Sequence, residues 1–445
     1  MKIKPQQVHC FKTFLPLREE LDKQKHITLS LPASDADVPV TMAKTYYIQH
    51  QWDQLPRHIL LIIFTHLSPN DRVSGSLTCR NWNACFNSPG LWRNFSFHFE
   101  KPEDKPKILS CLEKYDSVLR VVQIHLNPRH ELNCTNASRV LTHLARCKQR
   151  SLETLSIHFT KGNPLFFKGL DILSSLAELF GPPNPEIKHH SFLKEINLSE
   201  MSVTFDDKLF NLISANHPYL EVMNMQNNSL TCQVTPTCIE NFIRKCKRLR
   251  KLITFYKCIS DDALCALLER GREQIRYLSL LCKMEEKYHK LISVNTWVNL
   301  KKCLPDLRVA LLFDHTSDRQ QIRDILCPKI PLVELSMRSL TELHEEVDIV
   351  VNYFSRSLEI FTISTKRTDR LEQALINLAA HSMNLKVFHC YCGLRESTIK
   401  TFLEFQPHLT DYTLSITDLE DSTLPPLFTG RFAHVQAMKE MGLFE

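Results

Sequence analysis

The chain has 445 residues, of which 43% are hydrophobic and 23% charged, and its 55 basic residues exceed its 49 acidic residues by six. These proportions are typical of a globular protein with a sizeable core, and the mild positive charge does not demand nucleic-acid binding. Glycine is scarce, with 9 residues in 445, or about 2%, against roughly 7% in average proteins. Phosphate sites cradled by glycine-rich loops are therefore not expected.

The N-terminal sequence and the cysteines indicate a compartment. The first ten residues, MKIKPQQVHC, lack the apolar core of a signal peptide, and the 16 cysteines are scattered along the chain. The longest fully apolar run near the start, Ile59 to Phe64, is far shorter than the about 18 residues that suggest a membrane span. We expect a reduced intracellular protein, cytoplasmic and/or nuclear, without a transmembrane segment.

Residues 1–48 mix polar residues and proline without a sustained period, which predicts a mobile leader. The pattern changes at Trp52, and Pro56 stands where it can occupy the first turn of a helix. Five apolar residues then fall on one helical stripe, at offsets of 0, 1, 4, 5 and 8. They are Ile59, Leu60, Ile63, Phe64 and Leu67. This pattern predicts an amphipathic helix.

A second helical stretch follows the first. Residues 68–71 (Ser-Pro-Asn-Asp) separate the two, and the second carries Val73, Leu77 and Trp82 before it breaks at residues 88–90 (Ser-Pro-Gly). A unit of about 45 residues cannot bury so many large apolar groups, because small domains hide only a limited fraction of their surface. Part of this surface is expected to meet a partner.

These residues resemble the F-box family. The matching positions are Leu55-Pro56, Ile59-Leu60, Ile63-Phe64, Leu67, Ser68-Pro69, Asp71, Cys79-Arg80, Trp82 and Leu91-Trp92-Arg93. The resemblance implies a three-helix F-box over residues 49–97 that docks the Skp adaptor and, through it, the cullin and RING subunits of a ubiquitin ligase. Two positions depart from the family, Arg72 and Gly75, where leucine or alanine is more usual. The alternative is a plain amphipathic three-helix core.

The resemblance also implies an adaptor-binding set. Its members are Leu55, Pro56, Ile59, Leu60, Ile63, Phe64, Leu67, Trp82 and Trp92. The sequence does not divide the residues that face the adaptor from those that form the interior of the F-box.

After a linker helix over residues 98–118, a six-residue pattern recurs eleven times, with apolar residues at the first, fourth and sixth places, except that Thr254 takes the sixth place of one copy. The first places are Leu119, Leu152, Leu193, Leu220, Leu249, Ile275, Leu307, Leu332, Leu358, Leu385 and Leu409. Their mean spacing is 29 residues, at the upper edge of the leucine-rich-repeat range. Segments with helical spacing lie between the copies, and residues 181–185 read as an inserted surface loop.

The pattern resembles the irregular leucine-rich repeats of F-box proteins. It predicts an α/β fold in which the N-terminal F-box is followed by a strand-helix horseshoe over residues 119–415 and a C-terminal tail, residues 416–445. A generic mixed α/β or all-helical domain is the alternative.

Side chains alternate faces along a strand, so the third and fifth places of each copy are expected on the concave surface. The candidates for binding a client protein are Lys251, Ile253, Tyr277, Ser279, Val309, Leu311, Ile360, Thr362, Val387 and His389. Apolar residues at exposed positions favour recognition there. The alternative is that the tail, with its apolar residues 424–428, folds over them.

A basic run over residues 243–251 holds six basic side chains in nine. Three interpretations stay open. The run is a solvated helix end whose cations lie favourably near the C-terminus, a nuclear-import signal, or a site for an acidic or phosphorylated client.

Signatures of catalysis are absent. Gly-x-Gly-x-x-Gly, Gly-x-x-x-x-Gly-Lys, Gly-x-Ser-x-Gly, Cys-x-x-Cys and His-Glu-x-x-His do not occur. The pairs Cys390 with Cys392 and His189-His190 lack the two-plus-two spacing of zinc sites. We expect no catalytic residue, no metal, no cofactor and no nucleic-acid or membrane partner.

The absence of catalytic motifs agrees with a non-catalytic receptor subunit of an SCF (Skp-cullin-F-box) ubiquitin ligase, because such a subunit accelerates ubiquitin transfer by proximity alone. The alternatives are an F-box scaffold that binds the adaptor without client turnover, and an enzyme on a mixed α/β fold.

Overall fold

The computed structural model describes residues 52–103, 108–162, 168–182, 193–227, 229, 231–283, 290–416 and 427–429. The chain forms two compact units that divide between Asn94 and Phe95. We call the first the helical unit and the second the solenoid. The expected leader, most of the expected loop after Gly181 and most of the tail lie outside the described residues.

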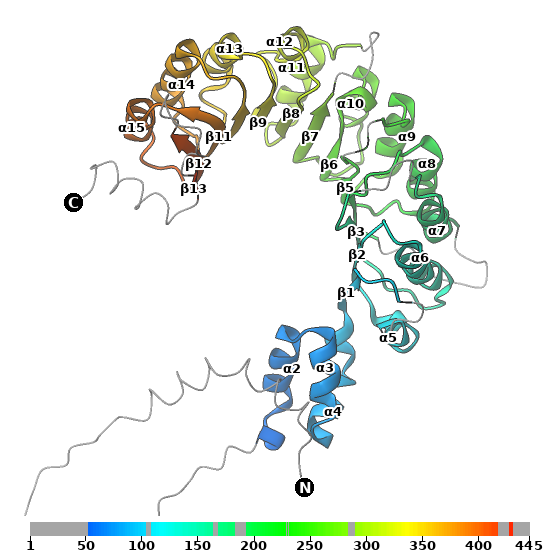
Figure 1. Ribbon diagram of the computed structural model, residues 1–445. Coiled ribbons are helices and arrows are strands. Elements are labelled where there is room, and N and C mark those ends of the chain that lie inside the picture. Colours follow the sequence, from blue (N-terminus) through cyan, green and yellow to red (C-terminus); the bar gives the residue numbers. More distant parts are fainter. Residues whose placement is uncertain are drawn as a thin grey trace, which may run out of the picture. The chain divides into compact units, whose positions relative to one another are not determined.

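The helical unit consists of three short helices framed by two 3-10 turns, and Figure 1 shows the helices packed together. They are η3 (Trp52–Gln54), α2 (Arg57–His66), α3 (Pro69–Ser76), α4 (Arg80–Phe86) and η4 (Pro89–Trp92). Pro56 directly precedes α2, where its missing N–H leaves no helical bond unmade. The hydroxyl of Ser68 accepts a hydrogen bond from the backbone N–H of Asp71 at 3.2 Å and so begins α3. The three helices that the F-box resemblance implies are confirmed, whereas the single second stretch predicted through Val73, Leu77 and Trp82 is divided into α3 and α4.

Aromatic side chains hold the helical unit together. Phe64 of α2 meets Trp82 of α4 edge to face, with ring centroids 5.6 Å apart, and Trp92 meets Phe86 in the same way at 5.0 Å. Both indole N–H groups are satisfied, because Trp82 donates to the carbonyl of Trp52 and Trp92 to that of Phe86. Each such ring pair adds about 0.5–1.5 kcal/mol beyond the burial of its surface.

The solenoid is built on one sheet whose thirteen described strands follow one another in chain order. The strands are β1 (Asn94–Phe99), β2 (Val121–Leu126), β3 (Thr154–Phe159), β4 (Glu195–Glu200), β5 (Val222–Asn224), β6 (Lys251–Phe255), β7 (Tyr277–Cys282), β8 (Arg308–Phe313), β9 (Leu332–Arg338), β10 (Ile360–Ser364), β11 (Val387–Leu394), β12 (Asp411–Ile416) and β13 (Leu427–Thr429). From β2 to β12 the strands are parallel, and β13 lies antiparallel to β12.

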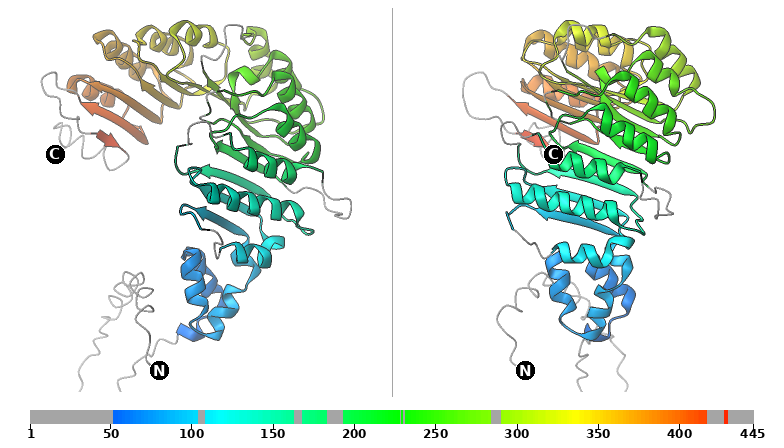
Figure 2. Two further views of the ribbon diagram at one scale, coloured as in Figure 1. Left: turned by 45° about the vertical axis from the view of Figure 1, so that its right-hand side comes forward. Right: turned by 90° about the vertical axis from the view of Figure 1, so that its right-hand side faces the viewer.

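Helices return the chain from one strand to the next and cover one face of the sheet (Figure 2). They are α5 (Ile108–Tyr115), η5 (Asp116–Val118), α6 (Glu131–Arg146), α7 (Leu170–Phe180), α8 (Asp207–Asn216), α9 (Pro236–Lys245), η6 (Tyr256–Cys258), α10 (Asp261–Ala266), α11 (Val294–Cys303), α12 (Arg319–Ile325), α13 (His344–Phe354), α14 (Asp369–His381) and α15 (Glu396–Phe405). One strand and one helix per repeat is the predicted α/β horseshoe architecture, which is confirmed.

Many of these helices begin in the same way. An N-cap side chain accepts a hydrogen bond from the backbone N–H three residues later, which stabilises a helix by about 1 kcal/mol. The residues that do so are Asp206, Thr235, Ser260, Ser293, Asp318 and Thr368. The start of the helix is therefore encoded separately in each of these repeats.

The recurring apolar residues form the core between sheet and helices. Val122, Leu155 and Ile196 lie side by side in β2, β3 and β4 and are fully buried. Each such side chain contributes about 1.5–3 kcal/mol through burial. The eleven predicted copies correspond to the eleven parallel strands β2 to β12.

The sheet begins one strand earlier than the repeat pattern predicts. Phe95, Phe97 and Phe99 of β1 are buried in alternation with more exposed residues. Together with Trp92, the first two fit the same first, fourth and sixth spacing. Aromatic residues in place of leucines concealed this copy.

The prediction that Val309 and Leu311 line the concave face is wrong. Both side chains are fully buried, and in the parallel register they pair with the core residues Leu278 and Leu280 of β7. The copy predicted at residues 307–312 is therefore one residue out of register. A slip of one residue moves every side chain of a strand to the opposite face.

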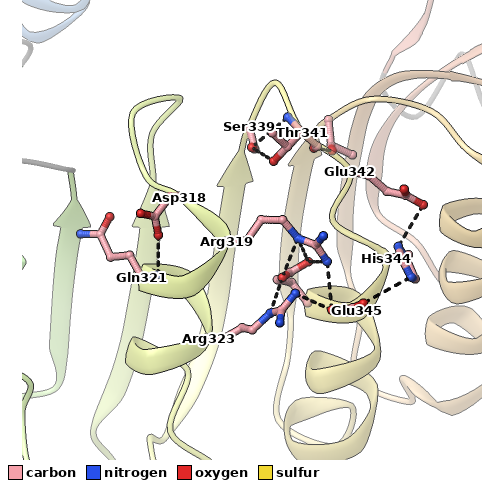
Figure 3. Close-up of polar contacts among 11 residues, drawn as sticks. Asp318, Arg319, Gln321, Arg323, Ser339, Thr341, Glu342, His344 and Glu345 are labelled. Atoms are coloured by element: carbon pink, nitrogen blue, oxygen red, sulfur yellow. Dashed lines mark hydrogen bonds and ion pairs between the residues drawn. The ribbon is translucent and has the colours of Figure 1, made fainter.

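A buried carboxylate joins two neighbouring repeats through Arg319 and Arg323, whose side chains lie close together in Figure 3. Glu346, in the first turn of α13, is fully buried and accepts hydrogen bonds from Arg319 at 3.1 Å and Arg323 at 2.7 Å, both on α12. The exposed Glu345 pairs with the same two arginines. Loss of one partner from such a cluster leaves an uncompensated buried charge, which is strongly destabilising.

Candidate adaptor-binding and client-binding surfaces

The structure divides the nine residues of the implied adaptor-binding set by exposure. Leu60, Phe64 and Trp92 are buried, Leu55, Ile63, Leu67 and Trp82 are half-buried, and Pro56 and Ile59 are exposed. The buried residues shape the helical unit, because Phe64 and Trp92 make its two ring pairs. The exposed and half-buried residues are the ones that a partner can reach.

Sequence reasoning left four exposed apolar residues out of this set. Trp52 is 49% exposed, Ile62 56%, Val73 43% and Leu77 77%. Ile62 lies off the helical stripe that begins at Ile59, so the stripe pattern passed over it. An isoleucine beside the stripe, three residues from Ile59, was the signal that could have found it, since apolar surface in water marks an interaction site.

The two departures from the F-box pattern have structural reasons. A Cβ on Gly75 would lie 3.3 Å from the ring of Phe64 and 3.4 Å from that of Trp82, so glycine lets α3 approach this ring pair closely. Arg72 donates to three backbone carbonyls, including those of Leu67 at 3.1 Å and Thr65 at 3.3 Å. Both residues thereby stabilise the helical unit itself.

At the centre of the concave face the structure brings together Lys251, Tyr277 and Glu334. Lys251 and Tyr277 are neighbours in the register of β6 and β7, and the ammonium group lies 5.0 Å from the ring centroid. The hydroxyl of Tyr277 donates to Glu334 of β9 at 2.8 Å. Burial, together with this carboxylate, raises the pKa of Tyr277. The centre is therefore polar and pre-arranged, and Ile253 lies next to Ser279 in the same two strands.

Toward the C-terminus the concave face becomes more apolar. Ile360 of β10 lies beside Glu334 on one side and Val387 of β11 on the other, and both apolar side chains are half-buried. Thr362 and His389 form the next pair, and the ring of His389 lies within hydrogen-bond distance of the Thr413 hydroxyl, at 3.0 Å. The row from Tyr277 to Val387 is thus continuous across the sheet.

The first strands carry a histidine stack that the sequence analysis did not single out. His98, His125 and His158 of β1, β2 and β3 stack in parallel, with centroids 4.6 Å apart in both steps. Beyond the stack, Nδ1 of His158 lies 3.2 Å from a carboxylate oxygen of Glu200. Burial and the two neighbouring imidazoles lower the pKa of His125. Each histidine directly follows the sixth place of its repeat, which was the available signal.

The basic run of residues 243–251 is folded. Cys246 and Leu249 are fully buried, so the run forms the end of α9, a turn and the start of β6. Arg250 pairs with Glu273 at 2.6 Å and with Glu221 at 3.4 Å. This structure does not favour a nuclear-import signal, because such a signal has to be read as an accessible chain.

The part of the chain that the structure describes contains no group of three His, Cys, Asp or Glu residues able to hold a metal ion. Cys390 and Cys392 are buried with their sulfurs 3.0 Å apart. Residues 189–190, the histidine pair, lie outside the described residues. No described helix is long and apolar enough to cross a membrane.

Comparison with known families gives the class of the N-terminal part. Residues 52–98 match the F-box-like family. The F-box domain therefore covers the helical unit and reaches into β1, and it is followed by the leucine-rich-repeat-like strands and helices of the solenoid.

Relatives with the same combination are similar over most of the chain. Human F-box/LRR-repeat protein 8 is 25% identical over 367 residues, which are 82% of this chain and 95% of that protein. Mouse F-box/LRR-repeat protein 21 is 26% identical over 275 residues, 59% of either chain. A shorter match, 37% identical over 75 residues, is to F-box/WD repeat-containing protein A of Dictyostelium discoideum, of which it covers 6%.

Proposed function

We propose that this chain is the substrate-recognition subunit of an SCF ubiquitin ligase. The helical unit docks the Skp adaptor, which carries the cullin and RING subunits, and the solenoid holds a client protein in the cytoplasm or nucleus. The observation that carries the proposal is the apolar surface that the F-box domain leaves in water at Ile59, Ile62, Val73 and Leu77. Apolar anchors of this kind dominate the free energy of binding at protein interfaces.

The adaptor surface is built mainly from one side of α2. Pro56, Ile59 and Ile62 are spaced by three residues and are all exposed, so they share one face of the helix. Val73 of α3 and Leu77, which directly follows that helix, are four residues apart and are both exposed. The half-buried residues Leu55, Ile63, Leu67 and Trp82 border this surface, and Leu60, Phe64 and Trp92 support it from inside.

The client lies on the concave face, against Lys251, Ile253, Tyr277, Ile360 and Val387. These residues offer a polar centre with an apolar flank, a combination that gives a binding surface both orientation and affinity. The chain itself makes or breaks no covalent bond. It raises the effective concentration of client lysines near the ubiquitin-charged enzyme.

The adaptor interface is tested with the full-length chain and the purified Skp adaptor. Replacement of Ile59 and Ile62 by Asp places two charges in the proposed interface, and we expect adaptor binding to weaken by about a hundredfold or more. The matched control places Asp at Leu340 and Tyr353, two exposed apolar residues of the solenoid, and leaves adaptor binding unchanged. Failure of the folded native chain to bind the adaptor, or equal binding by both variants, would sink the proposal.

Client turnover separates a receptor from a scaffold. Ubiquitylation and abundance of cellular proteins are compared among cells that express the native chain, the Ile59/Ile62 variant, or a variant with Lys251→Glu and Tyr277→Ala. A receptor yields a set of proteins whose ubiquitylation requires both surfaces. An intact adaptor complex with no such set would establish the scaffold instead.

A further inference from the structure

Three consecutive turns of the solenoid concentrate positive charge. They join α9 to β6, α10 to β7 and α11 to β8, and comprise residues 244–250, 269–276 and 301–308. We call them the basic strip. The strip contains eleven lysines and arginines against three acidic residues, a net charge of +8, whereas the whole chain carries +6. The remainder of the chain is therefore slightly acidic, and the positive charge is local.

The three turns lie side by side at the N-terminal ends of β6, β7 and β8. The backbone N–H of Glu273 donates to the carbonyl of Lys247 at 2.8 Å, that of Arg276 to Arg250 at 2.8 Å, and that of Arg308 to Arg276 at 2.9 Å. The helices above them are also neighbours, since α9 packs on α10 and α10 on α11. The charges thus form one surface and not three separate ones.

Part of this charge has a role within the fold. Arg250 and Arg308 pair with carboxylates, as does Arg244. Arg248 lies over the ring of Tyr219 at 4.7 Å. Arg272 donates to the carbonyls of Ile243 and Ala266 and so caps two helix ends. These contacts agree with the interpretation as solvated helix ends.

The remaining cationic side chains of the strip make no such contacts within the described part of the chain. Six cationic side chains of the strip are exposed and have no ion-pair or hydrogen-bond partner among the described residues: Lys245, Lys247, Arg270, Arg276, Lys301 and Lys302. A helix C-terminus favours a cation in its last turn by only about 0.3–1 kcal/mol, and like charges in adjacent turns repel one another. This surplus favours an interaction surface for negative charge.

We propose that the basic strip binds an extended segment of a client protein that is rich in Asp and Glu. The inference rests on the proposed function, because it assigns the segment to a client, and it adds a second contact outside the concave face. Neighbouring helices are about 8–10 Å apart, so three repeats span roughly 20 Å, or about six residues of extended chain. A single phosphate group is too small to engage cations from all three turns.

The composition of the strip disfavours a nucleic acid. The three turns themselves contain no aromatic residue on which a base could stack, and the ring of Tyr219 beside them already carries Arg248. Glu269, Glu273 and Asp306 lie among the cations, and they oppose the continuous negative charge of a phosphate backbone. A peptide avoids the same repulsion by placing neutral or basic residues opposite them.

The test measures binding of fluorescent probes to the full-length chain by anisotropy. The first probe is a peptide of about twelve alternating Glu and Ser residues, the second has Gln for Glu, and the third is a DNA duplex of about twelve base pairs. We expect the Glu peptide to bind, the Gln peptide not to bind, and the duplex to bind more weakly than the Glu peptide. Affinity for the Glu peptide should fall steeply between about 50 and 200 mM salt.

Charge-matched variants locate the site. The variant Lys245→Gln, Lys247→Gln, Arg270→Gln should bind the Glu peptide about fivefold more weakly or worse. The control Lys161→Gln, Arg356→Gln, Lys366→Gln removes the same charge from exposed residues elsewhere and should change the affinity less than twofold. Circular dichroism checks that both variants are folded.

Three results would overturn the inference. They are no binding of the Glu peptide, equal loss in both variants, or tighter binding of the duplex. None of them depends on the adaptor, so a failure here leaves the adaptor test of the proposed function intact, and the reverse also holds.

Discussion

The F-box domain and the solenoid treat their apolar side chains differently. In the F-box domain Ile62 and Leu77 stand largely in water, whereas in the solenoid the residues of adjacent strands, such as Val122 and Leu155, are fully buried. A repeat hides its apolar face against the next repeat, but a unit of three short helices has no neighbour of its own kind. In the function proposed here the first surface serves a partner, whereas the second is used up within the chain itself.

The largest effect is expected from Phe64→Ala in the F-box domain. Phe64 is fully buried and forms the edge-to-face pair with Trp82, so truncation removes about 3–5 kcal/mol of stability. We expect residues 52–92 to lose protection from hydrogen exchange, measured by mass spectrometry, while the solenoid strands keep theirs. Adaptor binding is lost as a consequence of unfolding.

Ile62→Ala is the matched control on the same helix. Its side chain is 56% exposed, so stability should change by less than about 0.5 kcal/mol while adaptor binding still weakens. Equal protection from hydrogen exchange in the Phe64→Ala and Ile62→Ala variants would contradict the assignment of Phe64 to the core and Ile62 to the partner surface.

In the solenoid, Glu346→Ala is expected to cost about 3 kcal/mol. The substitution removes the buried acceptor of Arg319 and Arg323 and leaves their charges partly uncompensated where α12 meets α13. Urea unfolding followed by circular dichroism measures the change. Glu345→Ala, at the exposed carboxylate of the same cluster, should cost less than about 1 kcal/mol, and a comparable cost would contradict the role assigned to burial.

Acidification should destabilise the solenoid through His217. Burial, and secondarily the positive charge of Arg150, lowers the pKa of His217 to about 3 in the folded chain, whereas the unfolded chain titrates near the ordinary value of about 6.5. Below about pH 6.5 His217 therefore binds a proton in the unfolded state but stays neutral in the folded state. Stability is therefore complete above about pH 6.5 and falls by about 2 kcal/mol between pH 7 and pH 5.

Urea unfolding at the two pH values measures this loss. His217→Gln should reduce the difference between pH 7 and pH 5 by about the same 2 kcal/mol, whatever it does to stability at pH 7. An unchanged difference would show that other groups carry the pH dependence.

The smallest expected effect is a gain in stability. The hydroxyl of Thr254 is fully buried in β6, at the sixth place of its repeat, and has no hydrogen-bond partner among the described residues. Thr254→Val keeps the shape, removes the unsatisfied group and should stabilise the solenoid by about 1 kcal/mol. Thr296→Val is the contrast, because that hydroxyl donates to Asp261 at 2.5 Å, and a gain there too would refute the argument from hydrogen bonding.

Most of the repeat architecture was predictable because the spacing of the apolar residues indicates both where each strand lies and which of its faces the helices cover. Apolar residues at the first, fourth and sixth places identify the strand and fix which face meets the helices. The prediction failed in β8, where residues 307–312 offer apolar side chains in both registers, and only pairing with Leu278 and Leu280 decides between them. A local pattern cannot contain this information, because it resides in the neighbouring strand.

The implied adaptor-binding set stays a prediction, and what the structure adds is its division by exposure. Ile59 and Leu60 are adjacent on the same stripe, yet the first is exposed and the second fully buried. The stripe defines a face of α2, while the packing of that face against Trp82 of α4 decides which residues remain for a partner. Ile62 was not predicted because it lies outside the stripe, where an amphipathic helix is expected to carry polar residues.

The last described strand has a consequence for how the protein behaves at high concentration. A parallel sheet built by repetition ends in an open edge, and unpaired N–H and C=O groups there can template the addition of another molecule. Antiparallel pairing of residues 427–429 with β12 places a three-residue strand on this edge. A short terminal strand that runs in the opposite direction offers little template for further parallel growth. Removal of these residues should therefore favour end-to-end association of solenoids.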